Sequence, residues 1–287
     1  MKNMEAVQDF SHISVLLYET VDVLDVTPGK TYFDGTFGGG GHSRLILERG
    51  GNVRASDMDS DAIENAKVSE VFRPYFESGQ LTLTKSNFAD FLETSDDTFD
   101  GMLFDLGVSS HQLDTTERGF SFRRDARLDM RMDQTTPLSA YEIINEWDYD
   151  ELKRIFYEYG EERYAPRIAR RIVETRERRA IETTSQLVEL LNTHPKRVFQ
   201  ALRIAVQDEL GSIERMLKTA PDCLKSGGVI AVISFHSLED RLVKHAFRGD
   251  ARLSVITKHP ILPQNEELNE NTRSGSAKLR TARKVGE

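Results

Sequence analysis

The sequence has 287 residues, of which 38% are hydrophobic and 30% are charged, and its formal net charge is -9. This composition is typical of a globular protein with room for one large core or two domains. No run of about eighteen apolar residues occurs, so no membrane-spanning helix is expected. Asp9, His12 and Glu19 interrupt the start of the chain, where a secretory signal would be apolar. We therefore predict a cytoplasmic protein.

The cysteine content and the net charge exclude further classes of protein. The only cysteine, Cys223, cannot form a disulfide within the chain, and no Cys/His group has the spacing of a zinc site. No metal is therefore predicted, and Cys223 is predicted to lie in the core. The negative net charge argues against indiscriminate nucleic-acid binding but leaves local basic patches open.

Residues 12–25 carry apolar side chains at roughly helical spacing and predict a covering helix. His12 in this segment is either a packed or solvated histidine or part of a site. The next stretch, Asp34–Ser43, reads D-G-T-F-G-G-G-G-H-S and lies between a short apolar run and a helix-like stretch. In a doubly wound sheet this is where the first strand hands over to the first helix and where the cofactor binds.

Glycines in such a loop permit positive φ and a close approach of ligand to backbone. The dinucleotide signature is only approximated, because Gly38 and Gly40 fit while Ser43 takes the third place, and a flexible surface loop is the alternative. The next acidic position favours the cofactor loop. Asp57 ends the second apolar run about twenty residues further on, where such folds hold the ribose hydroxyls with a carboxylate.

A third strand is predicted at 81–83, and the loop after it carries Phe88, which either belongs to the core or stacks on a flat ring. A fourth strand, 101–104, ends in Asp105 and enters a loop with Ser109, Ser110 and Gln112. Polar groups at the carboxyl ends of parallel strands lie over the ligand crevice. This loop is therefore predicted to form the second half of the site.

Beyond Asp114 the strand and helix alternation stops. The patterns predict helices at 137–147, 151–159, 166–176 and 185–191. A strand returns only at 228–234, and it leaves Ser234 and His236 at its carboxyl end, with Ser237 and Asp240 as a capping pair for the next helix. The economical fold is one doubly wound, Rossmann-like α/β domain that is interrupted by an all-helical insertion.

Basic residues gather in three stretches. Residues 163–179 contain seven arginines against two glutamates, which is either a solvated helix face or a phosphate-binding surface. The stretch Arg118–Arg124, R-G-F-S-F-R-R, interleaves aromatic and basic residues and suits RNA. A third cluster, Lys278 to Lys284, closes the chain, and the polar, acidic stretch 260–276 before it predicts a mobile loop.

Eight stretches, in this order, resemble the bacterial small-subunit ribosomal RNA methyltransferase H family, the MraW-like enzymes. They are H-I-S-V-L-L from His12, D-G-T-F-G-G-G-G-H-S from Asp34, D-L-G-V-S-S from Asp105, R-G-F-S-F-R from Arg118, L-D-M-R-M-D from Leu128, Y-G-E-E-R from Tyr159, R-I-A-R-R-I-V from Arg167 and S-F-H-S-L-E-D-R from Ser234. One departure is His111, where the family usually has proline.

The resemblance implies a class I methyltransferase that uses S-adenosyl-L-methionine to methylate the exocyclic amine of a cytidine in 16S ribosomal RNA near the decoding centre. It implies a methyltransferase domain of residues 1–113 and 210–287, and a helical insertion, 114–209, that recognises RNA. The partner would be the small ribosomal subunit, with no membrane partner, and a homodimer would be unsurprising. The implied cofactor contacts are Gly40, Gly41, His42, Asp57, Phe88, Asp105 and Gln112.

Location alone marks candidates for holding the target amine and its proton: Asp105, Ser109, Ser110, Ser234 and His236. The residues do not identify the proton acceptor among them. Three alternatives stay open. They are an NAD-dependent oxidoreductase, a non-catalytic RNA-binding module, and a related methyltransferase that acts on another RNA or on a small molecule.

Overall fold

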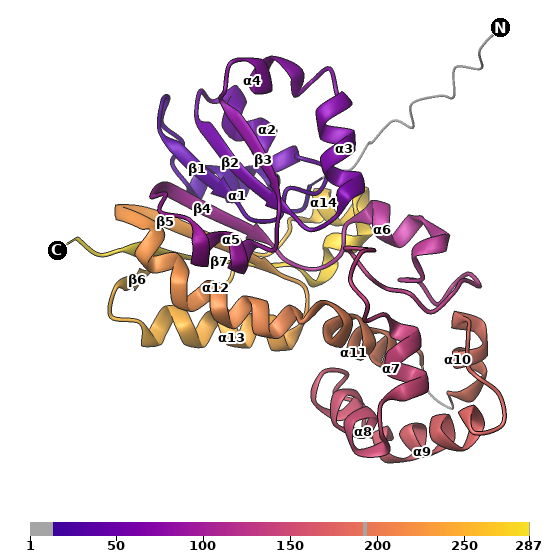
Figure 1. The fold of residues 1–287 in the computed structure, drawn as a ribbon. Helices are drawn as coiled ribbons and strands as arrows, with labels where there is room; N and C mark the ends of the chain where they lie inside the picture. The colour runs from indigo at the N-terminus through magenta and orange to yellow at the C-terminus, as the bar shows by residue number, and fades with distance from the viewer. Residues whose placement is uncertain (1–13, 192–193, 287) are drawn as a thin grey trace, which may run out of the picture.

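The computed structural model describes residues 14–191 and 194–286, so His12 lies outside the described residues. A seven-stranded sheet is flanked by helices, and a further group of helices lies beside it (Figure 1). The strand order is β3-β2-β1-β4-β5-β7-β6. The strands are β1 (Thr31–Asp34), β2 (Asn52–Asp57), β3 (Leu81–Lys85), β4 (Phe99–Asp105), β5 (Leu224–Ser234), β6 (Leu253–Val255) and β7 (Lys278–Lys284). This topology confirms the predicted doubly wound α/β class with a helical insertion.

Strands β1 to β5 run parallel, whereas β7 pairs antiparallel with both β5 and β6. The basic residues at the end of the chain belong to β7. Arg280 Nε donates to Asp240 Oδ1 at 2.6 Å, and Lys278 Nζ lies 3.5 Å from Asp240 Oδ2. The basic cluster therefore lies on a strand of the sheet, and Asp240 neutralises part of its charge. The charge pattern of the sequence did not indicate this strand.

Helices cover both faces of the sheet. Near one face lie α1 (Leu17–Val23), α2 (Gly41–Glu48), α3 (Ser60–Val68) and α4 (Arg73–Glu77), and near the other lie α5 (Phe88–Thr94), α12 (Glu209–Cys223) and α13 (Ser237–Gly249). Cys223 is buried in the second of these cores, as predicted. No helix of the described residues is long and apolar enough to cross a membrane.

The insertion leaves the sheet after β4 and begins with α6 (Ser110–Asp114) and the short η1 (Thr116–Arg118). Its other helices are α7 (Ala140–Glu146), α8 (Tyr149–Glu158), α9 (Ala165–Arg176), α10 (Thr184–Leu190) and α11 (Lys196–Gln207). The helices α7 to α11 share a hydrophobic core of their own, distinct from the cores on the sheet faces. Asp208, with φ 48°, makes the turn from α11 back into α12.

The stretch 260–276 was expected to be a mobile loop, but it contains α14 (Asn265–Glu270) and η2 (Thr272–Ser276). Glu267 Oε1 accepts a hydrogen bond from the Leu16 backbone N–H at 2.8 Å, so α14 is joined to the start of the described chain. Arg273 forms a two-pronged ion pair with Asp114 at the end of α6, at 2.6 and 3.1 Å. The prediction of a loop failed because composition does not reveal such long-range partners.

Candidate functional site

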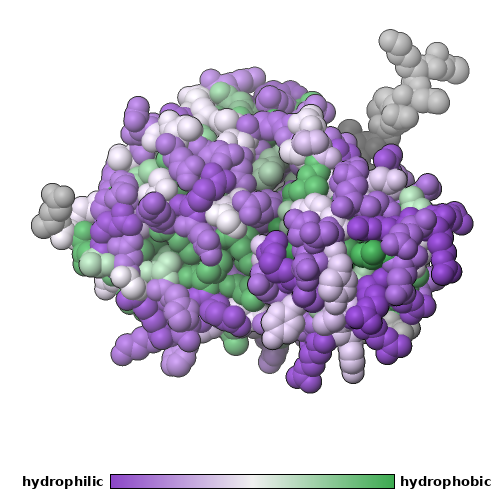
Figure 2. Space-filling view, turned by 60° about the horizontal axis from the view of Figure 1, so that its bottom comes forward, coloured by the Kyte–Doolittle hydropathy of each residue, from purple (hydrophilic) through white to green (hydrophobic). Residues whose placement is uncertain are grey.

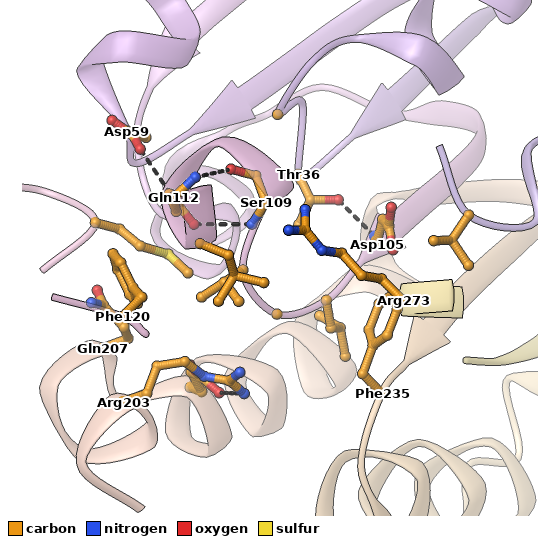
Figure 3. A pocket seen from close by; sticks show the side chains of 18 of the residues that line it. Thr36, Asp59, Asp105, Ser109, Gln112, Phe120, Arg203, Gln207, Phe235 and Arg273 are labelled. Carbon is orange, nitrogen blue, oxygen red and sulfur yellow. Dashed lines mark hydrogen bonds and ion pairs between the residues drawn. The ribbon is translucent and has the colours of Figure 1, made fainter. Parts of the chain in front are cut away.

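A cavity of about 1300 Å³ lies at the carboxyl ends of the parallel strands (Figure 3). One wall, called here the sheet wall, consists of the loops after β1, β2, β3, β4 and β5. The opposite wall, called the helical wall, consists of residues 120–124, α11 and the start of α12. Figure 3 shows Arg203 and Gln207 of the helical wall across from Asp59, Ser109 and Asp105. The predicted crevice is therefore present, with the insertion closing one side.

Asp57 organises the glycine loop. Its Oδ2 accepts from the Gly38 N–H at 2.7 Å, and its Oδ1 accepts from the Asp59 N–H at 2.8 Å. Burial raises the pKa of Asp57 to about 6, although these backbone hydrogen bonds oppose the shift. Gly38, with φ 52°, lines the cavity beside it. The structure thus places Asp57 where a ligand held by the loop would meet its remaining lone pairs.

Gly40 and Gly41, two implied cofactor contacts, are not among the residues that line the cavity. A Cβ at Gly40 would lie 2.4 Å from the Phe72 ring and 2.6 Å from the Phe37 ring, and one at Gly41 would lie 2.1 Å from Ser14 Oγ. These glycines are therefore needed for packing at the start of α2. Gly38 and Gly39 take the lining positions instead.

His42 and Asp105, two of the implied cofactor contacts, lie close together and both line the cavity. His42 is buried, with Nε2 3.2 Å from the Val15 carbonyl oxygen and Nδ1 3.9 Å from Asp105 Oδ2. The Asp105 backbone N–H donates to Thr36 Oγ1 at 2.6 Å, but its buried Oδ1 has no hydrogen-bond partner among the described residues. Burial, together with the charge of nearby carboxylates including Glu239, raises the pKa of Asp105 well above its usual value. This oxygen is an acceptor that can serve a donor in the cavity.

Phe88 lines the cavity at the start of α5, and its ring packs edge-on against the Phe104 ring with centroids 5.6 Å apart. It is half-buried, so it joins the core cluster and still offers part of its surface to the cavity. A Cβ at Gly35 would lie 2.5 Å from Phe104 and 3.0 Å from Phe88, so the first position of the glycine loop must be small to admit both rings.

Ser109 and Gln112 cap α6 reciprocally. Ser109 Oγ accepts from the Gln112 N–H at 3.2 Å, and Gln112 Oε1 accepts from the Ser109 N–H at 3.0 Å. Gln112 Nε2 also donates to Asp59 Oδ2 at 2.8 Å. Both residues line the cavity. Their hydrogen bonds also hold the loop after β4 in place. His111 lies in the first turn of α6, where proline also fits, so the departure from the family leaves the cap intact.

Ser234, a catalytic candidate by location, is 2% exposed and does not line the cavity. Its hydroxyl donates to the Lys278 carbonyl at 3.4 Å, across the sheet toward β7. Strand alternation explains the difference, because neighbouring side chains of a strand point to opposite faces. The side chain of Ser110 lies outside what the structure describes.

His236 does line the cavity, and it is the N-cap of α13, the role expected of Ser237. Its Nε2 lies 3.2 Å from Glu239 Oε1 and 4.0 Å from Glu209 Oε2. Burial lowers its pKa, but the two carboxylates outweigh burial and raise it to about 9. A positive charge is therefore favoured at this point of the wall.

Sequence reasoning missed the residues that surround His236. Arg203 of α11 donates from Nε and Nη2 to the carboxylate of Glu209, at 2.7 and 3.0 Å. Glu239 Oε2 accepts from the backbone N–H groups of Phe235 and His236, at 2.7 and 3.2 Å. The apolar period of α11 was the signal that could have revealed this helix, since all its buried residues except Gln207 are apolar.

The stretch Arg118–Arg124 divides into two parts. Arg118 is 3% exposed and bonds to Asp59, to Asp61 and to two backbone carbonyls, so the expectation that it binds RNA is wrong. Arg123 and Arg124 instead lie at the cavity with Phe122. Alternating composition cannot distinguish a buried arginine from an exposed one.

The family model described as the MraW methylase family matches residues 9–285, which is almost the whole chain, and confirms the family that the motifs resemble. Similar solved structures include a proposed rRNA methylase from Clostridium thermocellum, at 15% identity and a TM-score of 0.48, covering 95% of this chain and 99% of that one.

Two streptococcal structures are similar at a comparable level. An rRNA methylase from Streptococcus thermophilus has 10% identity and a TM-score of 0.47, covering 96% of this chain and 99% of that one. A proposed methyltransferase from Streptococcus mutans, solved in complex with SAH, has 12% identity and a TM-score of 0.44, covering 95% and 99%. These likenesses are low, and the family match is the stronger finding.

Proposed function

Because the chain belongs to the MraW methylase family, we propose that it methylates the exocyclic amine of a cytidine in small-subunit ribosomal RNA near the decoding centre. S-adenosylmethionine is the methyl donor. One observation carries the proposal: Asp105 Oδ1 has no hydrogen-bond partner among the described residues. Asp105 lines a cavity between the glycine loop and the helical insertion. The proposed place of action is the cytoplasm.

The cavity fits S-adenosylmethionine. Gly38 and Gly39 offer backbone without side chains, Asp57 offers a carboxylate to the ribose hydroxyls, and Phe88 offers a ring to the adenine. Asp105 Oδ1 lacks a partner in the described chain and would accept from, or lie beside, a positively charged group. When bound, the cofactor would supply a methyl group carried on a sulfonium sulfur. The sulfur would become a neutral thioether once the methyl group is transferred.

The chain's own residues have to position the amine and to accept its proton. In an in-line displacement the nitrogen must approach the methyl carbon to roughly 3–3.5 Å. As the new N–C bond forms and the C–S bond breaks, the nitrogen becomes cationic and must release one N–H proton. We assign Asp105 as the acceptor, because it lines the cavity and its Oδ1 has no hydrogen-bond partner among the described residues. His236, which is favoured as a cation, suits this task less well.

We propose that residues 114–209 recognise the RNA. Arg123, Arg124 and Lys196 lie at the cavity on the helical wall. On α9, Ile168 and Ile172 face the core of the insertion, whereas Arg167 and Arg170 are exposed and can meet phosphates. Hydrophilic side chains gather over this part of the molecule in Figure 2. Tyr157 in α8 and Tyr164 just before α9 are 67% and 61% exposed and could stack on unpaired bases.

The test is to incubate the protein with methyl-labelled S-adenosylmethionine and small ribosomal subunits from cells that lack this gene. The RNA is then digested, and the labelled nucleoside is identified by mass spectrometry. Label on the exocyclic amine of a single cytidine is the expected result. Label confined to another nucleoside, or found only with another RNA or a small molecule, would show a different substrate and overturn the proposal. Asp105→Asn protein serves as the control for contaminating methylases.

A further inference from the structure

We propose that Glu209, His236 and Glu239 form a binding site for a divalent metal ion in the wall of the cavity. The three residues come from the start of α12, the N-cap of α13 and the first turn of α13. One ligand atom of each lies within 4.8 Å of the others. The sequence predicted no metal, because Glu209 is far from the other two along the chain and only the fold brings them together.

Two buried atoms of this cluster lack hydrogen-bond partners in the part of the chain that the structure describes. They are His236 Nε2 and Glu239 Oε1, on side chains that are 10% and 1% exposed. The two atoms are 3.2 Å apart, yet they make no hydrogen bond, so the oxygen lies off the direction of the ring N–H. Buried polar atoms seldom go unsatisfied. A common partner placed between them would satisfy both.

A metal ion fits this arrangement better than a direct hydrogen bond does. A ligating imidazole points its nitrogen lone pair at the ion, at about 2.0–2.1 Å for zinc, and the other ligands flank that axis. Glu239 Oε1 lies 3.2 Å and Glu209 Oε2 4.0 Å from Nε2. Small side-chain movements would bring the three atoms around one ion. The Glu239 N–H donates to His236 Nδ1 at 3.5 Å, the long end of the range for such bonds. This cap would be given up when Nε2 binds an ion and the ring proton moves to Nδ1.

The outer contacts of the cluster are those that orient metal ligands, since ligating carboxylates are themselves hydrogen-bonded. Glu239 Oε2 is held by two backbone N–H groups, which leaves Oε1 for an ion. Arg203 holds Glu209 through both oxygens, but each carboxylate oxygen has a second lone pair. Among the described residues Glu239 forms its ion pair with His236, so an ion bound at this point would take the place of the Nε2 proton.

The donor set indicates the class of ion. One imidazole nitrogen with two carboxylate oxygens suits Mn²⁺ or Zn²⁺, whereas Ca²⁺ prefers six to eight oxygen ligands. Three protein ligands leave coordination positions open, as in sites that also bind a substrate or water. All three residues line the cavity, so an RNA phosphate or a base oxygen could take an open position. This would neutralise negative charge where RNA enters.

The test uses full-length protein that has been treated with a chelator and then dialysed, without RNA or methyl donor. Mn²⁺ is titrated by calorimetry, and the bound ion is examined by pulsed electron paramagnetic resonance for coupling to a histidine nitrogen. One Mn²⁺ per chain with nitrogen coupling is expected. Glu239→Gln and His236→Gln should each weaken binding at least tenfold, since each removes one ligand. His245→Gln, an exposed histidine on the same helix, is the matched control and should bind as the wild type does.

Circular dichroism confirms that each variant is folded before its binding is compared. No stoichiometric binding at millimolar Mn²⁺, or binding that both variants leave unchanged, overturns the proposal. The cluster would then hold only a proton on His236. The readout needs neither substrate nor methyl transfer, so it stands or falls separately from the proposed reaction.

Discussion

The two walls of the cavity differ in how their residues are brought together. The sheet wall is built from short, contiguous stretches, each of which follows a strand, and its main side chains lie within a few residues of a strand end. The helical wall combines residues 120–124, α11 and the start of α12, which no local pattern connects. Parallel strands impose this order on the sheet wall, because their carboxyl ends share one edge. No such rule governs the helical wall.

The two walls also differ in what their polar groups do. On the sheet wall Asp105 keeps an unpartnered oxygen for a ligand, while Ser109 and Gln112 hold the loop. On the helical wall Arg203 forms an ion pair with Glu209. The orphaned atoms belong to His236 and Glu239, which follow β5 on the sheet wall and meet Glu209 where the two walls join. Our proposals therefore place the chemistry at the reacting amine on the sheet wall, and the metal ion where the two walls meet.

The largest expected effect on stability comes from removing the contacts of Arg118, which connect the two walls. Arg118, in the segment between them, is buried and joins the Asp59 carboxylate after β2 to the carbonyls of Arg131 and Met132. Arg118→Met leaves Asp59 as a buried charge without its counter-ion and should lower the free energy of unfolding by about 3–5 kcal/mol. Urea denaturation measures the change. Arg215→Met, which breaks an exposed pair with Asp90, should cost at most about 1 kcal/mol. Equal losses would contradict the structural role of Arg118.

The next effect tests the sheet wall as the place of chemistry. Asp105→Asn keeps the shape of the side chain but removes the proton acceptor, so kcat should fall by about 100-fold or more. Single-turnover methyl transfer measures it, with thermal unfolding as the check on folding. Ser234→Ala, whose hydroxyl faces β7, should stay within about threefold of the wild type. A large loss for Ser234→Ala and none for Asp105→Asn would reverse the assignment.

Much of the sheet wall could be predicted from the sequence, and little of the helical wall. The glycine loop, Asp57, Phe88 and Asp105 follow from strand ends, and the structure places all of them at the cavity. Ser234 also lies at a strand end, but its buried hydroxyl donates to the Lys278 carbonyl of β7 and does not line the cavity. The family resemblance implies cofactor contacts at Gly40 and Gly41, whereas in the structure Gly38 and Gly39 line the cavity and Gly40 and Gly41 pack against neighbouring side chains.

The residues where the two walls meet were missed for a different reason. Glu209, His236 and Glu239 meet only after the chain has passed through α12 and β5, so their spacing carries no signature. Arg118 and the basic residues of β7 were read from composition, which records charge and not the carboxylates that meet it in the fold. Long-range ion pairs and packing decide these positions.

A third experiment separates the packing glycines from the lining glycines. Gly40→Ala, with φ 76° and a Cβ that would meet two phenylalanine rings, should lower the free energy of unfolding by about 1–3 kcal/mol. Gly38→Ala meets no close neighbour, so it should cost less stability but weaken cofactor binding, because the methyl group enters the lining of the cavity. Denaturation and calorimetry are compared for both variants. Weaker cofactor binding in Gly40→Ala alone would restore Gly40 as the contact.

A smaller effect follows from the pKa of Asp57. The pKa is raised to about 6, so the carboxylate is ionised above that pH and accepts ribose hydroxyls best there. As the pH falls through about 6 the group takes up a proton, and cofactor affinity should fall, by up to tenfold per pH unit. Calorimetry between pH 8 and pH 5 measures this. Asp57→Asn should bind weakly at every pH with a flatter profile. If Asp57→Asn keeps the pH profile of the wild type, the pH dependence of cofactor binding belongs to Asp105 or to Asp34. The pKa of Asp34 is also raised to about 6.

The smallest effect concerns the outer surface of the insertion. Arg167→Ala and Arg170→Ala each remove an exposed charge from α9 without touching its buried face, so stability should change by less than about 0.5 kcal/mol. If these arginines meet phosphates, each variant should bind RNA a few-fold more weakly, and its salt dependence should flatten by about one counter-ion. Fluorescence anisotropy with a ribosomal RNA fragment at several salt concentrations measures both. An unchanged salt slope in the double variant would show that α9 is a solvated face and would confine RNA recognition to the arginines at the cavity.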